Sequence, residues 1–390
     1  MPFAAVVSTA LDARQAVDEV CRDARTQMGD ATIDLAMVFF SPHHADSAGP
    51  IARLLHGKLQ PRCLLGCVGE SIVGNRREIE GDPAMVLWLG SWEGKATIEP
   101  FQLTMSETSE GVTLLGWPDG MIEADPKRSL LITLGDPYTF PTAEIFLPRL
   151  NEDHPGLAVV GGMASSPNGP SAGSLLLNDE AVSEGAVGVL LQGDFPWQSV
   201  VSQGCRPIGR PLVITKGEGN VIIEVGGMRP IDYLRGLYEE LSVHDQQLFE
   251  RGLLLGLAIT EYRDEFRSGD FLIRNLLGLD RSSGATAVND RIRVGQTVQF
   301  QVRDGTSADE DLRQMLRHQR EAGFIPQGGL LFTCNGRGSR MFSESSHDAG
   351  AIQNELGPIP LAGFFAAGEL GPVCGRNFIH GFTASAVFFG

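Results

Sequence analysis

The sequence predicts an α+β protein in which mixed and antiparallel sheets are covered by helices. Two observations lead to this class. Short apolar runs of strand length recur along the 390 residues, and between them lie segments whose apolar residues have helical spacing. Many connections between the strand-like runs are too short for the crossovers that parallel strands need. We therefore expect helices packed on sheets, in about three β-α-β-β units within two domains.

The first domain is expected over residues 1–227. Apolar residues with charges between them predict an amphipathic helix over residues 11–29. Apolar runs then predict three strands and one short helix: strand 33–40, helix 50–59, strand 62–68 and strand 84–89.

A strand-helix-strand-strand succession occurs three times along the chain. The first two strands begin near residues 35 and 63, then 130 and 157, then 330 and 361. The second strand of each unit runs into a glycine-containing loop, at residues 66–70, 161–165 and 363–369. True internal repetition and convergence on a common pattern both explain this similarity. We expect the three strand ends to occupy equivalent places in their sheets.

The second domain is expected over residues 228–390, because composition changes after Gly226-Gly227. Residues 229–242 have one apolar helical face, and residues 307–320 form a charged helix. Residues 297–302 alternate strictly, as half-buried antiparallel strands do. Three further strands are predicted over residues 253–259, 271–277 and 285–288.

Composition limits the classes of function. A net charge of −17 argues against nucleic acid and anionic membranes as partners. The amino terminus lacks the pattern of a signal peptide, and apolar runs are too short for a membrane span. Six scattered cysteines do not form a disulfide framework, so we expect a reduced, cytoplasmic protein. Cys63 and Cys67 are expected in the core rather than on a metal.

Common catalytic signatures give little support for an enzyme. Residues 169–173 spell G-x-S-x-G, but they lack the strand before and the helix after that a nucleophile elbow needs, so a loop is expected. His43 and His44 are expected in a solvated loop, because adjacent histidines rarely aim at one metal ion. No phosphate-binding loop or zinc-protease motif is present, and no cofactor is expected.

Two glycine-rich strand ends predict a small-molecule site. The residues concerned are Cys334, Asn335, Gly336, Arg337 and Gly338 after one strand, and Gly368 and Glu369 after another. The Arg337 guanidinium suits a ligand carboxylate and the Glu369 carboxylate suits an ammonium group. Alternatively, Arg337 and Glu369 pair with each other and brace the two loops. Arg274 and Asn275 are polar within an apolar strand, which indicates either function or an edge strand.

The chain resembles the FIST family, a two-part module found in bacterial sensory proteins and in an F-box protein of animals. The resemblance covers nearly the whole chain and rests on an ordered set of elements. These are VSQGCRPIG (201–209), RNLLGLD (274–280), VGQTVQFQVRD (294–304), C-x-G-R-G (334–338), G-E-x-G-P (368–372) and the closing T-x-x-x-V-F-F strand. It implies an intracellular signal-transduction protein that binds a small ligand such as an amino acid, without catalysis. A downstream signalling partner is implied, because no output domain is recognised in the sequence.

Two other functions remain open. Cys334 as nucleophile, His380 as base and Glu369 as orienting group would make a cysteine-dependent hydrolase or transferase. His380 is otherwise a core histidine or orients a polar group. An exposed β edge or a large apolar patch would instead indicate a protein–protein scaffold.

Overall fold

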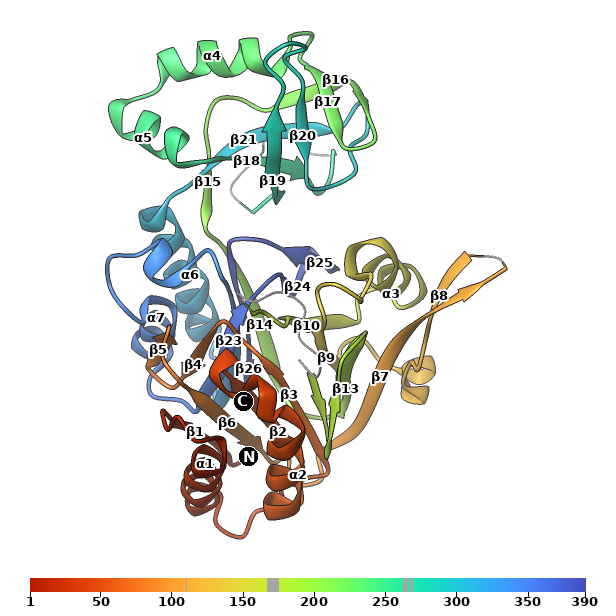
Figure 1. Ribbon diagram of the computed structural model, residues 1–390, viewed down its shortest axis with the longest axis vertical. Helices are drawn as coiled ribbons and strands as arrows, with labels where there is room; N and C mark the ends of the chain where they lie inside the picture. Colours follow the sequence, from red (N-terminus) through yellow and green to blue (C-terminus); the bar gives the residue numbers. More distant parts are fainter. Residues whose placement is uncertain (110, 167–174, 262–265, 267–268) are drawn as a thin grey trace. The chain divides into compact units, whose positions relative to one another are not determined.

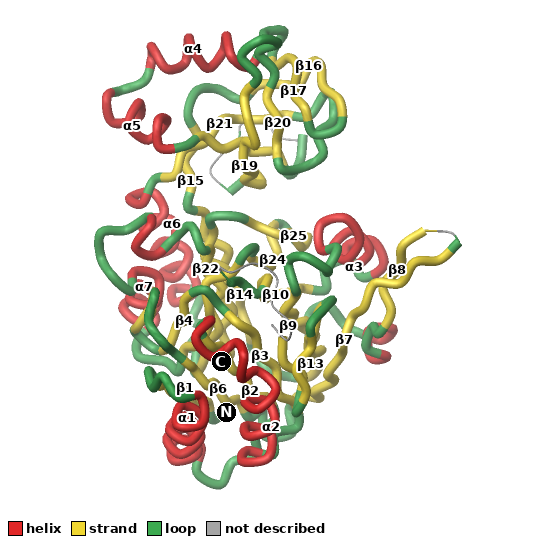
Figure 2. Tube along the Cα trace, viewed as in Figure 1, coloured by secondary structure: helices red, strands yellow, loops and turns green. Residues whose placement is uncertain are grey.

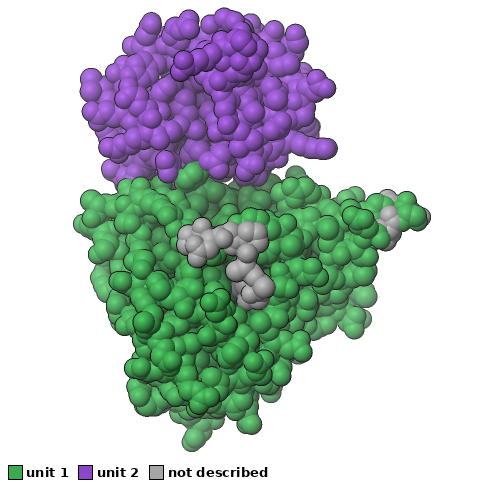
Figure 3. Space-filling view, viewed as in Figure 1, with its two compact units in different colours: residues 1–201, 312–390 green, residues 202–311 purple. Residues whose placement is uncertain are grey.

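The computed structural model describes residues 1–109, 111–166, 175–261, 266 and 269–390. The chain divides into two compact units (Figure 3): unit 1 comprises Met1–Val201 and Leu312–Gly390, and unit 2 comprises Ser202–Asp311. Unit 2 is therefore an insertion into the chain of unit 1. The predicted boundary near residue 227 falls inside unit 2, so the compact units divide the chain differently from two consecutive domains.

Unit 1 contains three modules with the same order of elements (Figure 1). In each module the first strand pairs in parallel with the second strand and antiparallel with the third. This topology confirms the predicted β-α-β-β units. The bounds are β2 (Leu35–Phe40), α2 (Ala48–Leu59), β3 (Cys63–Val68) and β6 (Met85–Gly90) in module A; β9 (Ser129–Gly135), α3 (Leu147–Asp153), β10 (Ala158–Met163) and β13 (Ala186–Gly193) in module B; β22 (Gly328–Cys334), α7 (His347–Leu356), β23 (Leu361–Ala366) and β26 (Thr383–Phe389) in module C.

The hairpin that follows the second strand of each module joins the sheet of another module. The pairs are β4 (Ser71–Gly74) and β5 (Arg77–Glu80) from module A on β23 of module C; β24 (Glu369–Val373) and β25 (Arg376–His380) from module C on β10 of module B; and β11 (Leu175–Leu177) and β12 (Glu180–Val182) from module B on β3 of module A. The exchange is cyclic. Each of the three sheets is therefore completed by residues from a different module.

A flanking strand extends each of these sheets beside the third strand of the module. The flanking strands are β1 (Phe3–Ser8) for module A, β7 (Ala96–Thr108) with β8 (Gly111–Leu115) for module B, and β14 (Trp197–Gln203) for module C. In module A, β1 leads directly to helix α1 (Ala13–Met28). In module C the corresponding connection, from β14 to helix α6 (Gly305–Glu321), contains almost all of unit 2.

The inner faces of the three sheets meet in one apolar core. Phe39 from module A packs on Phe332 and Phe364 from module C, with the ring centroids of Phe39 and Phe364 5.1 Å apart. Cys63 and Cys67 are fully buried in this core, which confirms their predicted role. Helices cover the outer faces: α1 and α2 on module A, α3 on module B, and α6 and α7 on module C. Figure 2 shows the helices outside the strands.

One glycine in the second strand of each module lies close to the first strand. Gly66 is opposite Val38, Gly161 is opposite Thr133 and Gly363 is opposite Leu331. A Cβ atom on these glycines would lie 2.4, 1.9 and 1.7 Å, respectively, from the carbonyl oxygen of the residue opposite. Glycine is therefore required at the same structural position in all three modules, as the three glycine-containing strand ends predicted.

Unit 2 is a seven-stranded antiparallel sheet with two helices, α4 (Pro230–Glu240) and α5 (Val243–Arg251). The strands are β15 (Cys205–Pro207), β16 (Leu212–Glu218), β17 (Val221–Val225), β18 (Leu253–Ala258), β19 (Phe271–Leu279), β20 (Thr286–Val288) and β21 (Thr297–Arg303). The last four, β18 to β21, follow the strands predicted over residues 253–259, 271–277, 285–288 and 297–302, whereas β15, β16, β17 and α5 were not predicted. Ile214, Phe300 and Leu234 are among the residues of its own apolar core.

Sheets of mixed and antiparallel pairing with helices on their faces confirm the predicted α+β class. The G-x-S-x-G sequence at 169–173 lies outside the described residues. Within the described chain, no helix is long and apolar enough to cross a membrane.

Candidate functional site

A cleft of about 460 Å³ opens where strands of modules A and C end, and we call it the strand-end cleft. Ligands of α/β sheets bind at the carboxyl ends of parallel strands, because the loops there diverge and carry polar side chains. The lining residues follow β2, β3, β5 and β22 or lie at an end of β4, β5 or β23; they are Pro42, His43, Glu70, Ser71, Glu80, Gly81, Asn335, Ser339, Arg340 and Phe365.

Charged side chains of opposite sign face each other across this cleft. Arg340, in the short 3-10 helix η4 (Gly338–Arg340), pairs with Glu70 and donates to the Asn335 carbonyl oxygen at 2.8 Å. Glu80 accepts hydrogen bonds from the Ser339 hydroxyl at 2.6 Å and from the Ser339 amide at 3.0 Å. The side chain of Arg340 is 56% exposed, so its ion pair is screened by water and weak. The cleft thus offers one exchangeable cation and two carboxylates.

Asn335 supplies an unused acceptor. It is the first residue after β22, and its backbone amide donates to the Ala366 carbonyl oxygen at 3.1 Å. This bond fixes the side chain at the junction of two parallel strands. Its Oδ1 atom is buried and has no hydrogen-bond partner in the described part of the chain. A buried acceptor left unpaired is unfavourable, so this position favours a ligand that brings an N–H or O–H donor.

Arg337 points into the interior of module C, away from the strand-end cleft. Its side chain is fully buried, and its Nε and Nη2 atoms each donate to Asp348 at 2.7 Å. The alternative in which Arg337 pairs with Glu369 is therefore wrong, because the guanidinium of Arg337 donates its hydrogen bonds to Asp348 of α7. A guanidinium buried without a carboxylate would be very unfavourable, and α7 brings Asp348 close to it.

Asp348 is the centre of a buried polar cluster. It also accepts from the Thr333 hydroxyl at 2.6 Å and lies 2.9 Å from Nδ1 of His347. The attraction of Arg337 and these hydrogen bonds outweigh burial and hold the pKa of Asp348 well below its ordinary value. Phe342 stacks on the His347 ring, with the centroids 3.4 Å apart.

Glu78, from the exchanged hairpin, completes this cluster. Its Oε1 atom accepts from the Ala349 amide at 2.8 Å, and this bond caps the first turn of α7. Burial raises the pKa of Glu78, and the charge of Asp348 adds to that rise. Burial and the Asp348 charge thus favour the protonated form of Glu78. The cluster fastens the hairpin of module A to the helix of module C.

Glu369 is also fully buried, at the start of β24. Its Oε2 atom accepts from the Thr383 hydroxyl at 2.7 Å and from the Thr383 amide at 3.1 Å. Burial raises the pKa of Glu369 to about 8, although Thr383 opposes the shift. Glu369 is therefore a neutral acid at pH 7 and, like Arg337, does not line the strand-end cleft.

The surroundings of the Cys334 thiol disfavour the thiolate form that a nucleophile needs. Burial raises its pKa, and the nearby Glu369 carboxyl raises it further. A reactive cysteine needs a lowered pKa from a cation or from aligned amides. His380 is buried on β25, where its Nε2 atom lies 3.0 Å from the Gly371 carbonyl oxygen.

The remaining predicted residues lie in different surroundings. Gly336 and Gly338 form the turn after Asn335, and Gly368 precedes the buried Glu369. Arg274 and Asn275 belong to unit 2 on β19, where Arg274 pairs with Asp290 at 2.6 Å. Of the nine predicted ligand-binding residues, Asn335 alone is among those that line the strand-end cleft. A binding role for the others stays a prediction.

The sequence analysis did not select Glu70, Glu80 or Arg340. Glu70 ends the glycine-containing loop at residues 66–70, so its equivalence to Glu369 was a usable signal. Glu80 reaches the cleft because the hairpins are exchanged between modules, and no local sequence pattern predicts this exchange. His44 is a correction of another kind: it is buried at 1% exposure rather than solvated, whereas His43 is exposed.

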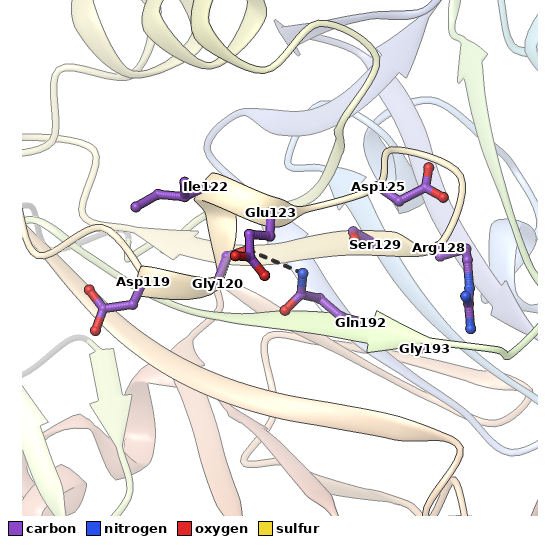
Figure 4. Close-up of a pocket in the computed structure, with 9 residues that line it drawn as sticks. All are labelled: Asp119, Gly120, Ile122, Glu123, Asp125, Arg128, Ser129, Gln192 and Gly193. Atoms are coloured by element: carbon purple, nitrogen blue, oxygen red, sulfur yellow. Dashed lines mark hydrogen bonds between the residues drawn. The ribbon is translucent and has the colours of Figure 1, made fainter.

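A second depression lies at the start of β9 in module B and has a volume of about 610 Å³. Figure 4 shows its acidic side chains spread apart, with the Gln192 amide donating to the Gly120 carbonyl oxygen at 3.2 Å. Asp119 and Arg128 lie at opposite ends. Because it is at the amino end of a strand and its charges do not converge, we consider the strand-end cleft the better candidate.

Comparison with known proteins identifies the family. Residues 34–228 match the FIST N domain and residues 232–372 match the FIST C domain. An uncharacterised protein of Mycobacterium tuberculosis is 43% identical over 384 residues, covering 98% of each chain. An uncharacterised protein of Mycobacterium bovis is 43% identical over 386 residues, covering 98% of this chain and 97% of the relative. The chain therefore belongs to the FIST family, whose domains are associated with sensing in signal transduction.

Proposed function

We propose that this protein is a cytoplasmic sensor that binds a small zwitterionic metabolite, such as an amino acid, in the strand-end cleft and performs no chemistry on it. The observation that carries the proposal is the unpaired Oδ1 atom of Asn335 beside two carboxylates and one exchangeable arginine. None of the six cysteines, all of which lie among the described residues, is in a disulfide, which supports a reducing compartment.

The ligand is held through its two charges. Its carboxylate replaces Glu70 on the Arg340 guanidinium, which donates two parallel hydrogen bonds in a fixed geometry. Its ammonium group donates to Asn335 Oδ1 and to Glu80. Phe365 gives one apolar surface for the remainder of the molecule. The ammonium group satisfies the unpaired Asn335 Oδ1, and the carboxylate meets a guanidinium whose own ion pair is weak.

Binding without turnover is supported by the raised pKa of Cys334. A protonated thiol beside a neutral acid is a poor nucleophile. The ligand instead changes the contacts of η4, which holds both Glu70 and Glu80 through Arg340 and Ser339. A downstream signalling protein would detect this change at the surface.

A thermal-shift screen against amino acids and related metabolites tests the proposal. A ligand at about 100 times its dissociation constant stabilises the native state by about 2.7 kcal/mol. Glu80→Gln and Arg340→Gln should each weaken binding about tenfold or more, whereas Glu152→Gln on the surface of α3 is the matched control. Cys334→Ser should bind within about tenfold of the natural protein, or about 1.4 kcal/mol.

Two outcomes contradict the proposal. Equal affinities of Glu80→Gln and Glu152→Gln would place the ligand elsewhere. Rapid stoichiometric acylation of Cys334 by activated esters at neutral pH, lost in His380→Ala, would show a nucleophilic enzyme.

A further inference from the structure

A separate pocket of about 350 Å³ lies between the first turns of α1 and α2 on the outer side of module A. We call it the helix-end pocket. The residues that line it come from these two helices and from the short helix η1 (Pro42–Ser47); they are Leu11, Asp12, Ala13, Arg14, His43, His44, Ser47, Pro50, Ile51 and Leu54. The function proposed above does not use this pocket.

The amino terminus of α1 opens on the helix-end pocket, and the first turn of α2 lies beside it with its Ala48 amide already bonded to the Ala45 carbonyl oxygen. The first amides of an α-helix have no partner within the helix, and the aligned peptide dipoles make this end positive. In α1, Asp12 Oδ1 accepts from the Gln15 amide at 2.8 Å, which leaves the amides of Ala13 and Arg14 at the helix end. Neither α1 nor α2 has an acidic residue in its first turn.

His44 is the independent sign that a ligand is missing. Its side chain is 1% exposed and lines the pocket, yet neither ring nitrogen has a hydrogen-bond partner among the residues that the structure describes. A neutral imidazole has one N–H donor and one acceptor, and burying both unpaired is unfavourable. Burial, together with the neighbouring His43, lowers the pKa of His44, so the ring is neutral near pH 7.

We infer that the helix-end pocket binds a small phosphate-type oxyanion. Its oxygens accept from the amides of Ala13 and Arg14, from the N–H of His44 and from the guanidinium of Arg14. Amides at helix ends are a recurrent phosphate site, and arginine matches the geometry of phosphate. The one acid in the lining, Asp12, is engaged with the Gln15 amide.

A metal ion is the competing occupant, because Asp12, His43 and His44 are all potential ligands. However, across the described residues no group of three such side chains is placed to hold a metal. His43 also lines the strand-end cleft, so the two cavities share one wall. An oxyanion bound next to His43 would therefore lie close to a ligand in the strand-end cleft. Its binding does not require that such a ligand is present.

Titration of the full-length protein with inorganic phosphate at constant ionic strength tests the inference. We expect phosphate to shift the backbone amide resonances of Ala13 and Arg14 and the ring nitrogen resonances of His44, and to raise the pKa of His44. Arg14→Gln should weaken phosphate binding at least fivefold. Arg22→Gln removes the same charge from the same helix at an exposed position and should leave the affinity unchanged.

Methyl phosphate, titrated in parallel, distinguishes the source of the anion. Tighter binding of the ester supports a phosphorylated metabolite, and tighter binding of inorganic phosphate supports the free ion. The absence of any resonance shift with either probe at ~50 mM overturns the inference. A dissociation constant at that concentration corresponds to ~1.8 kcal/mol of binding free energy. Equal weakening by Arg14→Gln and Arg22→Gln also overturns it, because attraction would then be general. If His44→Gln folds, it tests the role of the His44 ring directly. If it does not fold, the comparison of Arg14→Gln with Arg22→Gln still tests the inference.

Discussion

At the scale of single residues, the interior of module C is held by charges rather than by apolar contacts alone. Arg337 and Asp348 are both fully buried and bonded through two nitrogen–oxygen pairs. Glu78 and Glu369 are buried beside them, and burial raises the pKa of each carboxyl. A buried ion pair is sensitive to the loss of one member, because the other charge is left without compensation.

Replacing Arg337 tests this role. Arg337→Met should lower the free energy of unfolding by about 3–5 kcal/mol, because Asp348 would remain buried and ionised. Arg340→Met changes an exposed side chain. It should lower the free energy of unfolding by about 1 kcal/mol or less. Urea unfolding measures both. If Arg337→Met is as stable as Arg340→Met, the buried pair does not brace the module.

Glu369 predicts a dependence of stability on pH. Its pKa in the folded protein is about 8, and the ordinary value of 4.5 applies to the unfolded chain. Between these values the unfolded chain binds fewer protons, so stability falls as pH rises, by up to about 1.4 kcal/mol per pH unit from this group. The free energy of unfolding of Glu369→Gln, measured by urea unfolding, should fall less steeply from about pH 5 to about pH 8. An unchanged slope would mean that Glu369 is ionised in the folded protein.

At the scale of elements, the three strands of each β-α-β-β unit and β18 to β21 of unit 2 were predictable because their apolar periods are strong, whereas β1, β7, β14 and β15 to β17 were not predicted. The three glycine-containing strand ends were also readable, since only glycine fits where Gly161 and Gly363 approach the neighbouring strand. The partners of the exchanged hairpins were not, because β4 and β23 are far apart in sequence and nothing local encodes their pairing. For the same reason Glu80 was missed. Asp348, the partner of Arg337, is only 11 residues away in the same module, but no sequence pattern marks it as the counter-ion.

The glycine positions make a quantitative prediction. Gly363→Ala should lower the free energy of unfolding by about 1–3 kcal/mol or more, because its Cβ would overlap the Leu331 carbonyl oxygen. Gly161→Ala should behave alike against Thr133. Gly350→Ala is the control, since its Cβ meets no atom within 4 Å and alanine favours the helix α7. Equal midpoints for Gly363→Ala and Gly350→Ala in thermal unfolding would refute the close approach.

At the scale of the whole molecule, unit 2 is an insertion into a repeated pattern. Its two connections lie next to each other, because Asp311 accepts from the Ser202 hydroxyl at 2.8 Å and from the Gln203 amide at 2.9 Å. The amide of Asp304 also donates to the Gly204 carbonyl oxygen at 3.3 Å. Insertions are tolerated at such points, since the ends of the inserted segment are already close.

Excision of unit 2 tests the independence of unit 1. A chain in which residues 205–303 are replaced by a short glycine-serine linker should keep a cooperative thermal transition, because Val200 and Leu312 pack in the same core of module C. Far-UV circular dichroism and calorimetry measure the transition. A non-cooperative or aggregated product would show that unit 1 needs unit 2 to fold.

The cyclic hairpin exchange also affects the order in which the protein can fold during synthesis. The ribosome releases module A first, yet its hairpin must wait for β23, and module B must wait for β24. Phe389 of module C also packs beside Phe3 and Trp88, so this contact too forms only after module C has been made. Domains usually fold one after another as they emerge, but these three modules have to close together. Nascent chains of this protein are therefore expected to expose unpaired strand edges until module C has been made.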